Sequence, residues 1–346
     1  MLIDTMSDDG ANYSAKSKGT VVLTAEQQLA INFFQVSSVS PTAKFTFIDL
    51  FAGIGGFHTA AGGLGGQCVF ASEIDTEAQR AYQANYGVMP FGDITAVNPA
   101  SIPNHDMLLA GFPCQPFSII GKRKGFDDIR GTLFFEIANI LNVKKPQCFV
   151  LENVKQLMTH NQGKTLAKIL ETLAQLGYKT YHKNLNALDY GLPQKRERTI
   201  IVGFINHDIT FTWPSKIVAV PLVNILEQDQ HIDPKHFASE RIAQKRLEKH
   251  TSSHSLAIWH ENKSGNISSY PYSCALRAGA SYNYLLVNGK RRLTPREMLR
   301  LQGFPDKFQI VCTDGQTRKQ AGNAVPVHMI KAVIQEVLNA TAKVKG

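Results

Sequence analysis

Residues 45–57, FTFIDLFAGIGGF, open with an apolar run and continue into a glycine-rich loop. The apolar run predicts a buried strand over residues 45–51, and the residues after the loop have a helical pattern. Strand, glycine loop and helix together form the first unit of a nucleotide-type α/β fold. The dinucleotide pattern requires a third glycine or alanine where this chain has His58, and no phosphate-binding lysine follows. The loop therefore favours a ligand that approaches the backbone without a pyrophosphate group.

Acidic residues follow the next two predicted strands. Residues 68–72 are apolar and precede Glu73, which lies 20 positions after Gly53, the offset at which an acidic side chain reaches a ribose diol. A third strand end at residues 92–94 offers the carboxylate of Asp93 to an adenine amino group. These features predict a nucleoside site without a phosphate-binding group. S-adenosylmethionine is such a ligand, since it joins adenosine to a sulfonium and an amino acid. Taken alone, Glu73 is equally consistent with a surface carboxylate.

A candidate nucleophile lies in the stretch GFPCQPFS at residues 111–118. Residues 107–110 predict a buried strand, so Cys114 falls at the carboxyl edge of the sheet, where ligands collect in open α/β folds. Pro113 and Pro116 prevent helix formation on either side. The alternative for a lone cysteine is a buried structural residue in a turn.

Charged residues mark two further segments. Glu152 directly follows an apolar strand, a position where partial desolvation suits a residue that exchanges a proton. Arg196 and Arg198 share one face if their segment is extended, and two guanidinium groups beside a buried strand at 199–204 require an anionic or carbonyl partner. The basic loop at 122–126 suits closure over a phosphate backbone. Taken singly, a residue such as Glu152 is more often a helix-start or surface acid, and the alternative for the loop is a solvated basic segment.

Composition places the chain among soluble globular proteins, with 43% hydrophobic and 19% charged residues among 346. This length predicts one large domain and a smaller one. A net charge of +9 and a pI near 9.2 favour a polyanionic partner. No apolar run is long enough to span a membrane, and residues 1–19 carry no apolar signal core, so we expect a cytoplasmic protein. Five scattered cysteines without a CxxC pair suit a reducing compartment and predict no metal site.

The carboxyl-terminal half contains a candidate second domain. From about residue 206 to 288 buried strands thin out, and basic residues are interleaved with aromatic ones, with a helix predicted over 235–250. Thr294 and Glu297 have the spacing of a capping box, so a helix begins there. A glycine–asparagine pair in segment 320–326 precedes a terminal helix and is predicted to complete a cofactor pocket.

Taken in order, these motifs resemble those of the cytosine-5 DNA methyltransferases of the compact bacterial type. The resemblance covers residues 45–338. It includes the glycine loop, the Pro-Cys stretch, the Glu-Asn-Val motif, the alternating arginines and the last two sequence motifs of the family. Ile74 departs from many relatives, which carry tryptophan beside the adenine, and residues 1–44 have no obvious counterpart. The resemblance implies an α/β fold with a Rossmann-like, mixed seven-strand sheet, dependent on S-adenosylmethionine, and a smaller target-recognition domain.

The resemblance also implies a division into domains. Residues 45–205 plus 320–346 would be the catalytic and cofactor-binding domain. Residues 1–44 lie outside the resemblance and largely lack apolar periodicity, so we expect a partly disordered extension. Residues 206–290 would be the target-recognition domain, and residues 291–319 a hinge with a motif helix. Double-stranded DNA would lie in the cleft between the two domains.

The implied reaction is methylation of carbon 5 of a cytosine flipped out of the duplex. Addition of the Cys114 thiolate to C6 makes C5 nucleophilic enough to accept a methyl group. Glu152 holds a proton at N3, and Arg196 and Arg198 hold the pyrimidine O2, Glu152 or a phosphate, with their roles undivided. The product of the methyl donor is S-adenosylhomocysteine. The resemblance implies cofactor contacts from Phe51, Gly53, Gly55, Glu73, Ile74, Asp93, Ile94 and Asn323. It implies DNA contacts from Gln115, Ser118, Lys122, Arg123, Lys124 and Gln194.

Two other functions are weighed against this one. A tRNA cytosine-5 methyltransferase typically carries Pro-Pro-Cys, whereas this chain has Phe112 before Pro113 and Cys114. A DNA-binding regulator without catalysis is disfavoured because Cys114, Glu152 and both arginines are intact. We expect a monomer that acts in a restriction–modification system, with a cognate endonuclease encoded separately.

Overall fold

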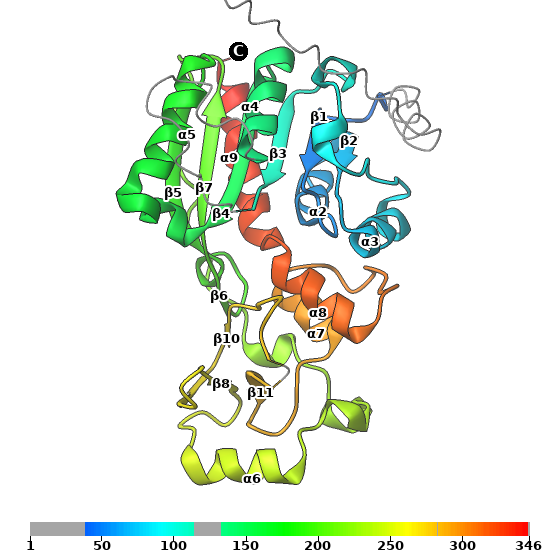
Figure 1. The fold of residues 1–346 in the computed structure, drawn as a ribbon, viewed down its shortest axis with the longest axis vertical. Coiled ribbons are helices and arrows are strands. Elements are labelled where there is room, and N and C mark those ends of the chain that lie inside the picture. Colours follow the sequence, from blue (N-terminus) through cyan, green and yellow to red (C-terminus); the bar gives the residue numbers. More distant parts are fainter. Residues whose placement is uncertain (1–38, 114–132, 282, 345–346) are drawn as a thin grey trace, which may run out of the picture.

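The computed structural model describes residues 39–113, 133–281 and 283–344, which form two lobes with helices α7 and α8 between them (Figure 1). The larger lobe is built on a six-stranded sheet in the order β2-β1-β3-β4-β7-β5. β2, β1, β3 and β4 are parallel, whereas β7 runs antiparallel to both β4 and β5. The expected mixed α/β sheet is confirmed. Its strands are β1 (Phe45–Leu50), β2 (Gly66–Ser72), β3 (Met107–Gly111), β4 (Cys148–Val154), β5 (Lys179–Asn186) and β7 (Glu197–Phe204).

Helices cover both faces of this sheet. α2 (Gly56–Gly62) and α9 (Val327–Ala342) pack against one set of strand residues, whereas α4 (Leu133–Lys144) and α5 (Lys164–Gln175) pack against the alternate set. α3 (Thr76–Tyr86) contributes to both layers. Because both faces are buried, the central strands are apolar at nearly every position. None of the helices in the described ranges has the length and apolar character needed to cross a membrane.

The resemblance implies a seventh strand, and its place beside β2 is held by a short extended segment. Phe91 forms an isolated parallel bridge with Ser72, supported by two hydrogen bonds of 2.8 Å. Pro90 has no N–H with which to lengthen the ladder, and Asp93 caps a 3-10 helix over Ile94–Ala96. The pairing therefore stays at one residue, and Asp93 is left at the carboxyl edge of the sheet.

The smaller lobe has its own sheet and its own core. β8 (Ile258–Glu261), β9 (Ile267–Tyr270) and β11 (Leu285–Val287) form an antiparallel sheet in the order β11-β8-β9. A separate parallel pair, β10 (Ser273–Cys274) with β6 (Gln194–Lys195), joins this lobe to the chain just before β7. The core beneath these strands is apolar and continues into α7 and α8.

The helix predicted over residues 235–250 is shorter in the structure. A 3-10 helix covers Pro234–His236, and α6 begins later, spanning Glu240–Lys249. Between them, Ala238 donates its N–H to the carbonyl oxygen of Lys290 at 2.9 Å. This hydrogen bond to a distant segment holds the chain before α6 in an extended form.

Helices α7 (Pro295–Leu301) and α8 (Asp314–Asn323) connect the lobes. The predicted capping box is confirmed, because Thr294 Oγ1 accepts the N–H of Glu297 at 3.1 Å and Glu297 Oε2 accepts the N–H of Thr294 at 2.8 Å. The glycine–asparagine pair lies in the last turn of α8, an element that the sequence pattern did not indicate. Pro326 follows and disfavours a helical conformation in the residue before it, so α9 begins as a new helix.

Candidate active site

The carboxyl ends of β1, β2, β3 and β4 open into a cavity of about 570 Å³, whose other wall comes from the smaller lobe and α8. This volume is within the usual range of roughly 300–1,000 Å³ for ligand sites. The cavity brings together most of the predicted site residues that the structure describes. They are Phe51, Gly53, Glu73, Ile74, Asp93, Ile94, Glu152, Arg196, Arg198 and Asn323.

Glu73 holds the glycine loop in place. Its Oε2 accepts the N–H of Gly53 at 2.7 Å, and its Oε1 accepts the N–H of Asp75 at 2.8 Å. Phe51 has a φ of 56°, a left-handed conformation that costs a non-glycine residue roughly 1–3 kcal/mol. Such strain persists only where the surroundings enforce it, and it concentrates at ligand sites. Glu73 therefore shapes the loop, and each of its carboxylate oxygens keeps a further lone pair for a ligand hydroxyl.

Two further residues of the predicted nucleoside site, one acidic and one apolar, also line the cavity. Asp93 Oδ1 accepts the N–H of Thr95 at 2.9 Å, which fixes the orientation of its carboxylate. Ile74 is 70% exposed although it is apolar, and it lines the cavity. Lys319, which sequence reasoning missed, also lines the cavity and pairs with Asp75 at 2.7 Å. Across the ranges that the structure describes, no three His, Cys, Asp or Glu side chains are grouped to hold a metal ion.

Gly55, which is expected to contact the cofactor, is not among the residues that line the cavity. It precedes α2 with a φ of 82°, and a Cβ on it would overlap the ring of Tyr86. Tyr86 Oη donates to the carbonyl oxygen of Gly55 at 2.8 Å, and its ring stacks on His58 with centroids 4.0 Å apart. Packing beneath the loop therefore requires the glycine here.

His58, which replaces the third glycine of the dinucleotide pattern, belongs to a buried polar cluster under the loop. Its Nδ1 lies 2.7 Å from Tyr82 Oη, and burial lowers the pKa of His58 to about 4. Burial, reinforced by the nearby Asp49, raises the pKa of Cys68 to about 12. Burial also raises the pKa of Asp49 well above its ordinary range. His58 and Cys68 are therefore uncharged near neutral pH, and they support the loop without ionic contacts.

Glu152 and Arg198 form an ion pair at the other end of the cavity. Glu152 is only 8% exposed, and its Oε1 lies 2.6 Å from Arg198 Nε. The antiparallel pairing of β4 with β7 brings the two side chains together. On the neighbouring strand β3, a Cβ on Gly111 would lie 3.6 Å from Glu152 Oε2, so the glycine leaves space beside this second oxygen. A carboxylate that is oriented on one side and accessible on the other suits proton exchange with a bound base.

Arg196 differs from Arg198 in its contacts. Its side chain is fully buried, and its guanidinium donates to the carbonyl oxygens of Leu276, Gly322 and Ala324 at 2.9, 2.9 and 2.8 Å. Burial, with the charge of Arg198 as a second cause, lowers the pKa of Arg196 to about 9. The three carbonyls belong to the smaller lobe and to the end of α8. Arg196 therefore links two walls of the cavity to each other, whereas Arg198 pairs with Glu152. Nothing in the sequence pattern indicated this difference between the two arginines.

Gln194 is expected to contact DNA, whereas in this structure its side chain is engaged within the protein. The side chain is fully buried. Its Nε2 donates to the carbonyl oxygen of Leu301 at 2.9 Å, and its Oε1 accepts the N–H of Leu276 at 3.0 Å. Both ends of the amide are therefore used within the protein, and Gln194 links β6 to α7 and to the smaller lobe.

The predicted nucleophile Cys114 lies outside the described residues, as does most of the amino-terminal extension. Pro113 and Leu133, the described residues on either side of the gap, both line the cavity. Asn153 Nδ2 donates to the carbonyl oxygen of Phe112 at 3.0 Å, which fixes the backbone just before the gap. Sequence reasoning gave Asn153 no role, although its place beside Glu152 at a strand end was a usable signal. Also outside the described residues are the expected DNA contacts Gln115, Ser118, Lys122, Arg123 and Lys124.

Comparison with known proteins identifies relatives of this chain. The Type II methyltransferase M.NgoBI of Neisseria gonorrhoeae is 57% identical over 287 residues, which cover 82% of this chain and 90% of the relative. The Type II methyltransferase M.HaeII of Haemophilus aegyptius is 54% identical over 299 residues, which cover 86% and 94%. A solved structure of a DNMT2 mutant from Spodoptera frugiperda shares the fold, with a TM-score of 0.68 at 21% identity over 85% of this chain and 99% of that one.

The family assignment depends on a match over most of the chain. Residues 45–339 match the profile of the family described as C-5 cytosine-specific DNA methylase. This range includes every described residue that lines the cavity. The chain therefore belongs to the C-5 cytosine-specific DNA methylase family and is a DNA cytosine-5-methyltransferase.

Proposed function

We propose that the nucleoside side of the cavity binds S-adenosylmethionine, which the family and the fold imply. Glu73 would accept hydrogen bonds from the ribose hydroxyls, Asp93 from the adenine amino group, and Phe51 would stack on the ring. Carboxylates on this side, with Lys319 already paired, suit a ligand that carries a positive sulfonium and no phosphate. When bound, the donor supplies the methyl group. Gly53, Ile74, Ile94 and Asn323 would complete the contacts.

We propose that the opposite side of the same cavity performs the addition chemistry. The observation that carries this is the Glu152–Arg198 ion pair, which shares one cavity with the nucleoside site and with Pro113. The Cys114 thiolate would add to C6 of the target cytosine, while Glu152 shares a proton with N3 so that negative charge does not accumulate on the ring. Arg198 would hold the carboxylate in the required orientation. Loss of the C5 proton and elimination of the thiolate then restore the aromatic ring and Cys114.

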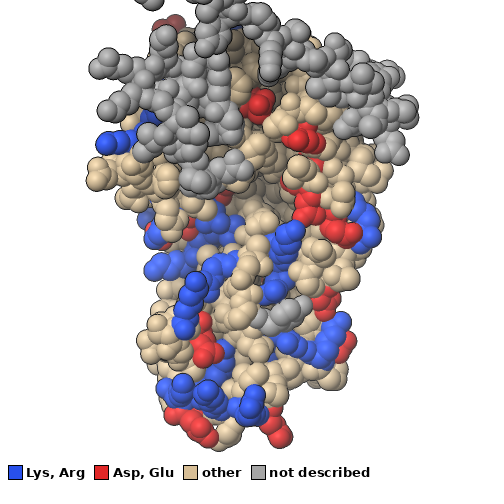
Figure 2. Space-filling model, viewed as in Figure 1, with Lys and Arg blue, Asp and Glu red and all other residues tan. Residues whose placement is uncertain are grey.

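The target base lies inside a stacked duplex, so it must be flipped out at a cost of a few kcal/mol. Figure 2 shows lysine and arginine side chains gathered across the middle of one face, where the two lobes meet. We propose that DNA lies along this junction and that residues 206–290 form the target-recognition domain. Residues 45–205 plus 320–346 would be the catalytic domain, and residues 291–319 the hinge. DNA binding should therefore weaken steeply as salt increases.

The names of the relatives suggest the biological setting. Both relatives described above are named Type II methyltransferases. We propose that this enzyme acts as a monomer in a restriction–modification system, with a cognate endonuclease encoded separately.

Two assays test the proposed function. Bisulfite sequencing of DNA from a host that expresses the protein should show 5-methylcytosine at one defined sequence. Transfer of a tritiated methyl group should label duplex DNA and leave tRNA unlabelled. Labelled tRNA with unlabelled DNA, or no transfer to either, would contradict the proposal.

The role of Glu152 is tested by Glu152→Gln. Single-turnover methyl transfer should slow by about 100-fold or more, while the dissociation constant of S-adenosylmethionine stays unchanged. Glu171→Gln is the matched control, because Glu171 lies exposed on α5 and pairs with Lys168 at 3.2 Å. Unchanged single-turnover kinetics in Glu152→Gln would defeat the assignment.

A further inference from the structure

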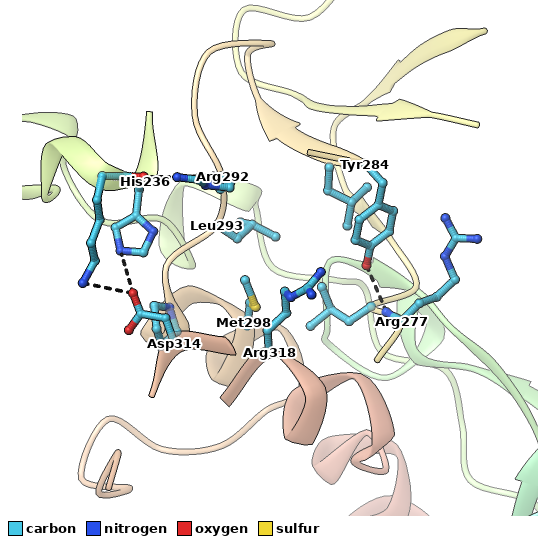
Figure 3. A pocket seen from close by; sticks show the side chains of 12 residues that line it. His236, Arg277, Tyr284, Arg292, Leu293, Met298, Asp314 and Arg318 are labelled. Carbon is cyan, nitrogen blue, oxygen red and sulfur yellow. Dashed lines mark hydrogen bonds and ion pairs between the residues drawn. The ribbon is translucent and has the colours of Figure 1, made fainter. Parts of the chain in front are cut away.

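A second pocket lies beside the active-site cavity and shares a wall with it. Its volume is about 210 Å³, and it is lined by residues of the smaller lobe together with α7 and α8 (Figure 3). Leu276 and Arg277 line both this pocket and the active-site cavity. A group bound in the pocket would therefore lie next to a base held in the cavity. The catalytic roles proposed above make no use of this pocket.

The pocket is rich in positive charge, and we refer to it as the arginine pocket. Its positively charged lining consists of Arg277, Arg292, Arg318 and Lys235, and burial lowers the pKa of the neighbouring His236. Among the described residues that line it, Asp314 is the sole carboxylate; it pairs with Lys235 at 3.0 Å and lies 3.6 Å from His236 Nε2. Figure 3 shows these paired groups on the side of the pocket opposite Arg277. The Arg277 side therefore favours an anionic ligand.

Arg277 is held in place before any ligand binds. The centre of its guanidinium lies 4.8 Å from the centroid of the Tyr284 ring. Its main-chain N–H donates to Tyr284 Oη at 2.9 Å. A guanidinium stacked on a buried ring has less freedom to lose on binding, and its planar edge suits paired hydrogen bonds to a phosphate.

The backbone that carries Arg277 is tied to the active site. Leu276 donates its N–H to Gln194 Oε1 at 3.0 Å and accepts from Arg196 Nη1 at 2.9 Å through its carbonyl oxygen. Two residues after Leu276, the backbone of Ala278 packs against Gly322 of α8. The two lie so close together that a Cβ on Gly322 would overlap the backbone of Ala278. These contacts set the position of Arg277 relative to the cavity.

We propose that Arg277 binds a phosphate of the DNA strand that carries the target cytosine, beside the extruded nucleotide. This inference rests on the proposed function, because it requires the cytosine to occupy the neighbouring cavity. Extrusion rotates a nucleotide about its backbone, so the flanking phosphates must be held in a displaced position. A guanidinium at a fixed distance from the cavity stabilises that position. Because it contacts the backbone, it acts on every sequence alike.

The test compares Arg277→Gln and Arg277→Met, which both remove the charge, with Arg277→Lys, which keeps it. Arg277→Met also preserves an apolar contact with Tyr284. An effect that the Gln and Met variants share can therefore be attributed to loss of the positive charge. The matched control is Lys183→Gln, which removes an exposed positive charge on the edge strand β5. Binding is measured by fluorescence anisotropy on a duplex that carries the methylation site mapped by bisulfite sequencing, at several salt concentrations. Fluorescence of 2-aminopurine at the target position reports extrusion of the base.

Removing the charge should weaken duplex binding by about tenfold or more, because this is the change in Kd that corresponds to the free energy of one charge-assisted hydrogen bond. The slope of log Kd against log salt should become less steep by about 0.9, the value for one phosphate contact, and the extrusion signal should fall. Arg277→Lys should keep the wild-type slope, and Lys183→Gln should match the wild type throughout. The methylated sequence and the Kd of S-adenosylmethionine should not change in any variant.

An unchanged salt slope in the Gln and Met variants would overturn the inference. A changed methylated sequence would also overturn it, because Arg277 would then contact a base edge. Either result leaves methyl transfer by the wild-type protein intact, so the failure of this inference is distinguishable from failure of the proposed function. Failure of the wild-type protein to methylate duplex DNA would contradict both the proposed function and this inference.

Discussion

Replacing Arg196 by methionine tests whether one buried guanidinium holds the walls of the active site together. Methionine has a similar length and no hydrogen-bond donor, so the substitution keeps much of the packing. The carbonyl oxygens of Leu276, Gly322 and Ala324 lose donors at 2.9, 2.9 and 2.8 Å. Leu276 and Gly322 also line the cavity, so the change should affect both stability and ligand binding.

The expected magnitude follows from two opposing free energies. Each buried carbonyl left without a donor costs about 1–3 kcal/mol. Removing a buried charge offsets part of this loss, because desolvation of an ion costs several kcal/mol. We expect a net decrease of about 3 kcal/mol in the free energy of unfolding. At about 2–4 °C per kcal/mol, Tm should fall by about 6–12 °C.

Urea unfolding followed by circular dichroism measures the stability, and calorimetry measures the Kd of S-adenosylmethionine. Arg80→Met is the control, since Arg80 is exposed, and its surface pair with Glu77 at 3.0 Å and its hydrogen bond to the carbonyl oxygen of Val311 at 2.7 Å should together contribute no more than about 1–2 kcal/mol. Arg196→Met should be less stable than this control and should bind the methyl donor more weakly. Equal stability of the two variants would refute the reasoning. A stability loss with an unchanged Kd would show that Arg196 does not shape the cavity.

Two further substitutions test the support of the site and of the fold. Tyr86→Phe removes the hydroxyl that donates to Gly55 at 2.8 Å beneath the glycine loop, so the Kd of S-adenosylmethionine should rise about 2–10-fold with little change in kcat. An unchanged Kd would count against this role. His105 lies buried two residues before β3, and burial lowers its pKa from 6.5 to about 4. Its contribution to stability is therefore present above pH 6.5 and is lost as the pH falls toward 4, by up to about 3 kcal/mol. His105→Gln should therefore flatten the fall in unfolding free energy across that range, and parallel curves for the two proteins would disprove it.

The sheet and the acidic half of the site were predictable because their signals are local. Strands buried on both faces are apolar at nearly every position, as residues 45–51 and 107–110 are. The ends of parallel strands meet at one edge, so Glu73, Asp93 and Glu152 could be expected in one cavity although they are far apart in the chain.

The remaining contacts depend on how the two lobes pack, which no local pattern encodes. Gln194 and Arg196 were grouped with Arg198 because the three alternate, yet the first two bind main-chain atoms of the smaller lobe and of α7 and α8. Helix α8 gave no apolar periodicity because it packs through small and polar residues. The buried members of this helix are Thr317, Gln320, Ala321 and Gly322.

The short elements of the smaller lobe were missed for a similar reason. β8, β9 and β11 are only 4, 4 and 3 residues long. Runs of this length carry little alternation, and their pairing is set by contacts with distant segments. Arg277 was visible in the sequence as part of a basic and aromatic segment, but only the structure places it between two cavities.

Covalent trapping measures the central claim most directly. In a duplex with 5-fluorocytosine at the methylated position, C5 carries fluorine in place of the hydrogen that must be removed as a proton after methyl transfer. The thiolate therefore cannot be eliminated, and the protein stays covalently bound to the DNA. With S-adenosylmethionine, the wild-type protein should form a denaturation-resistant adduct whose mass equals protein plus methylated duplex, and Cys114→Ser should form none. An adduct formed by Cys114→Ser, or no adduct from a wild-type protein that methylates ordinary DNA, would contradict the account.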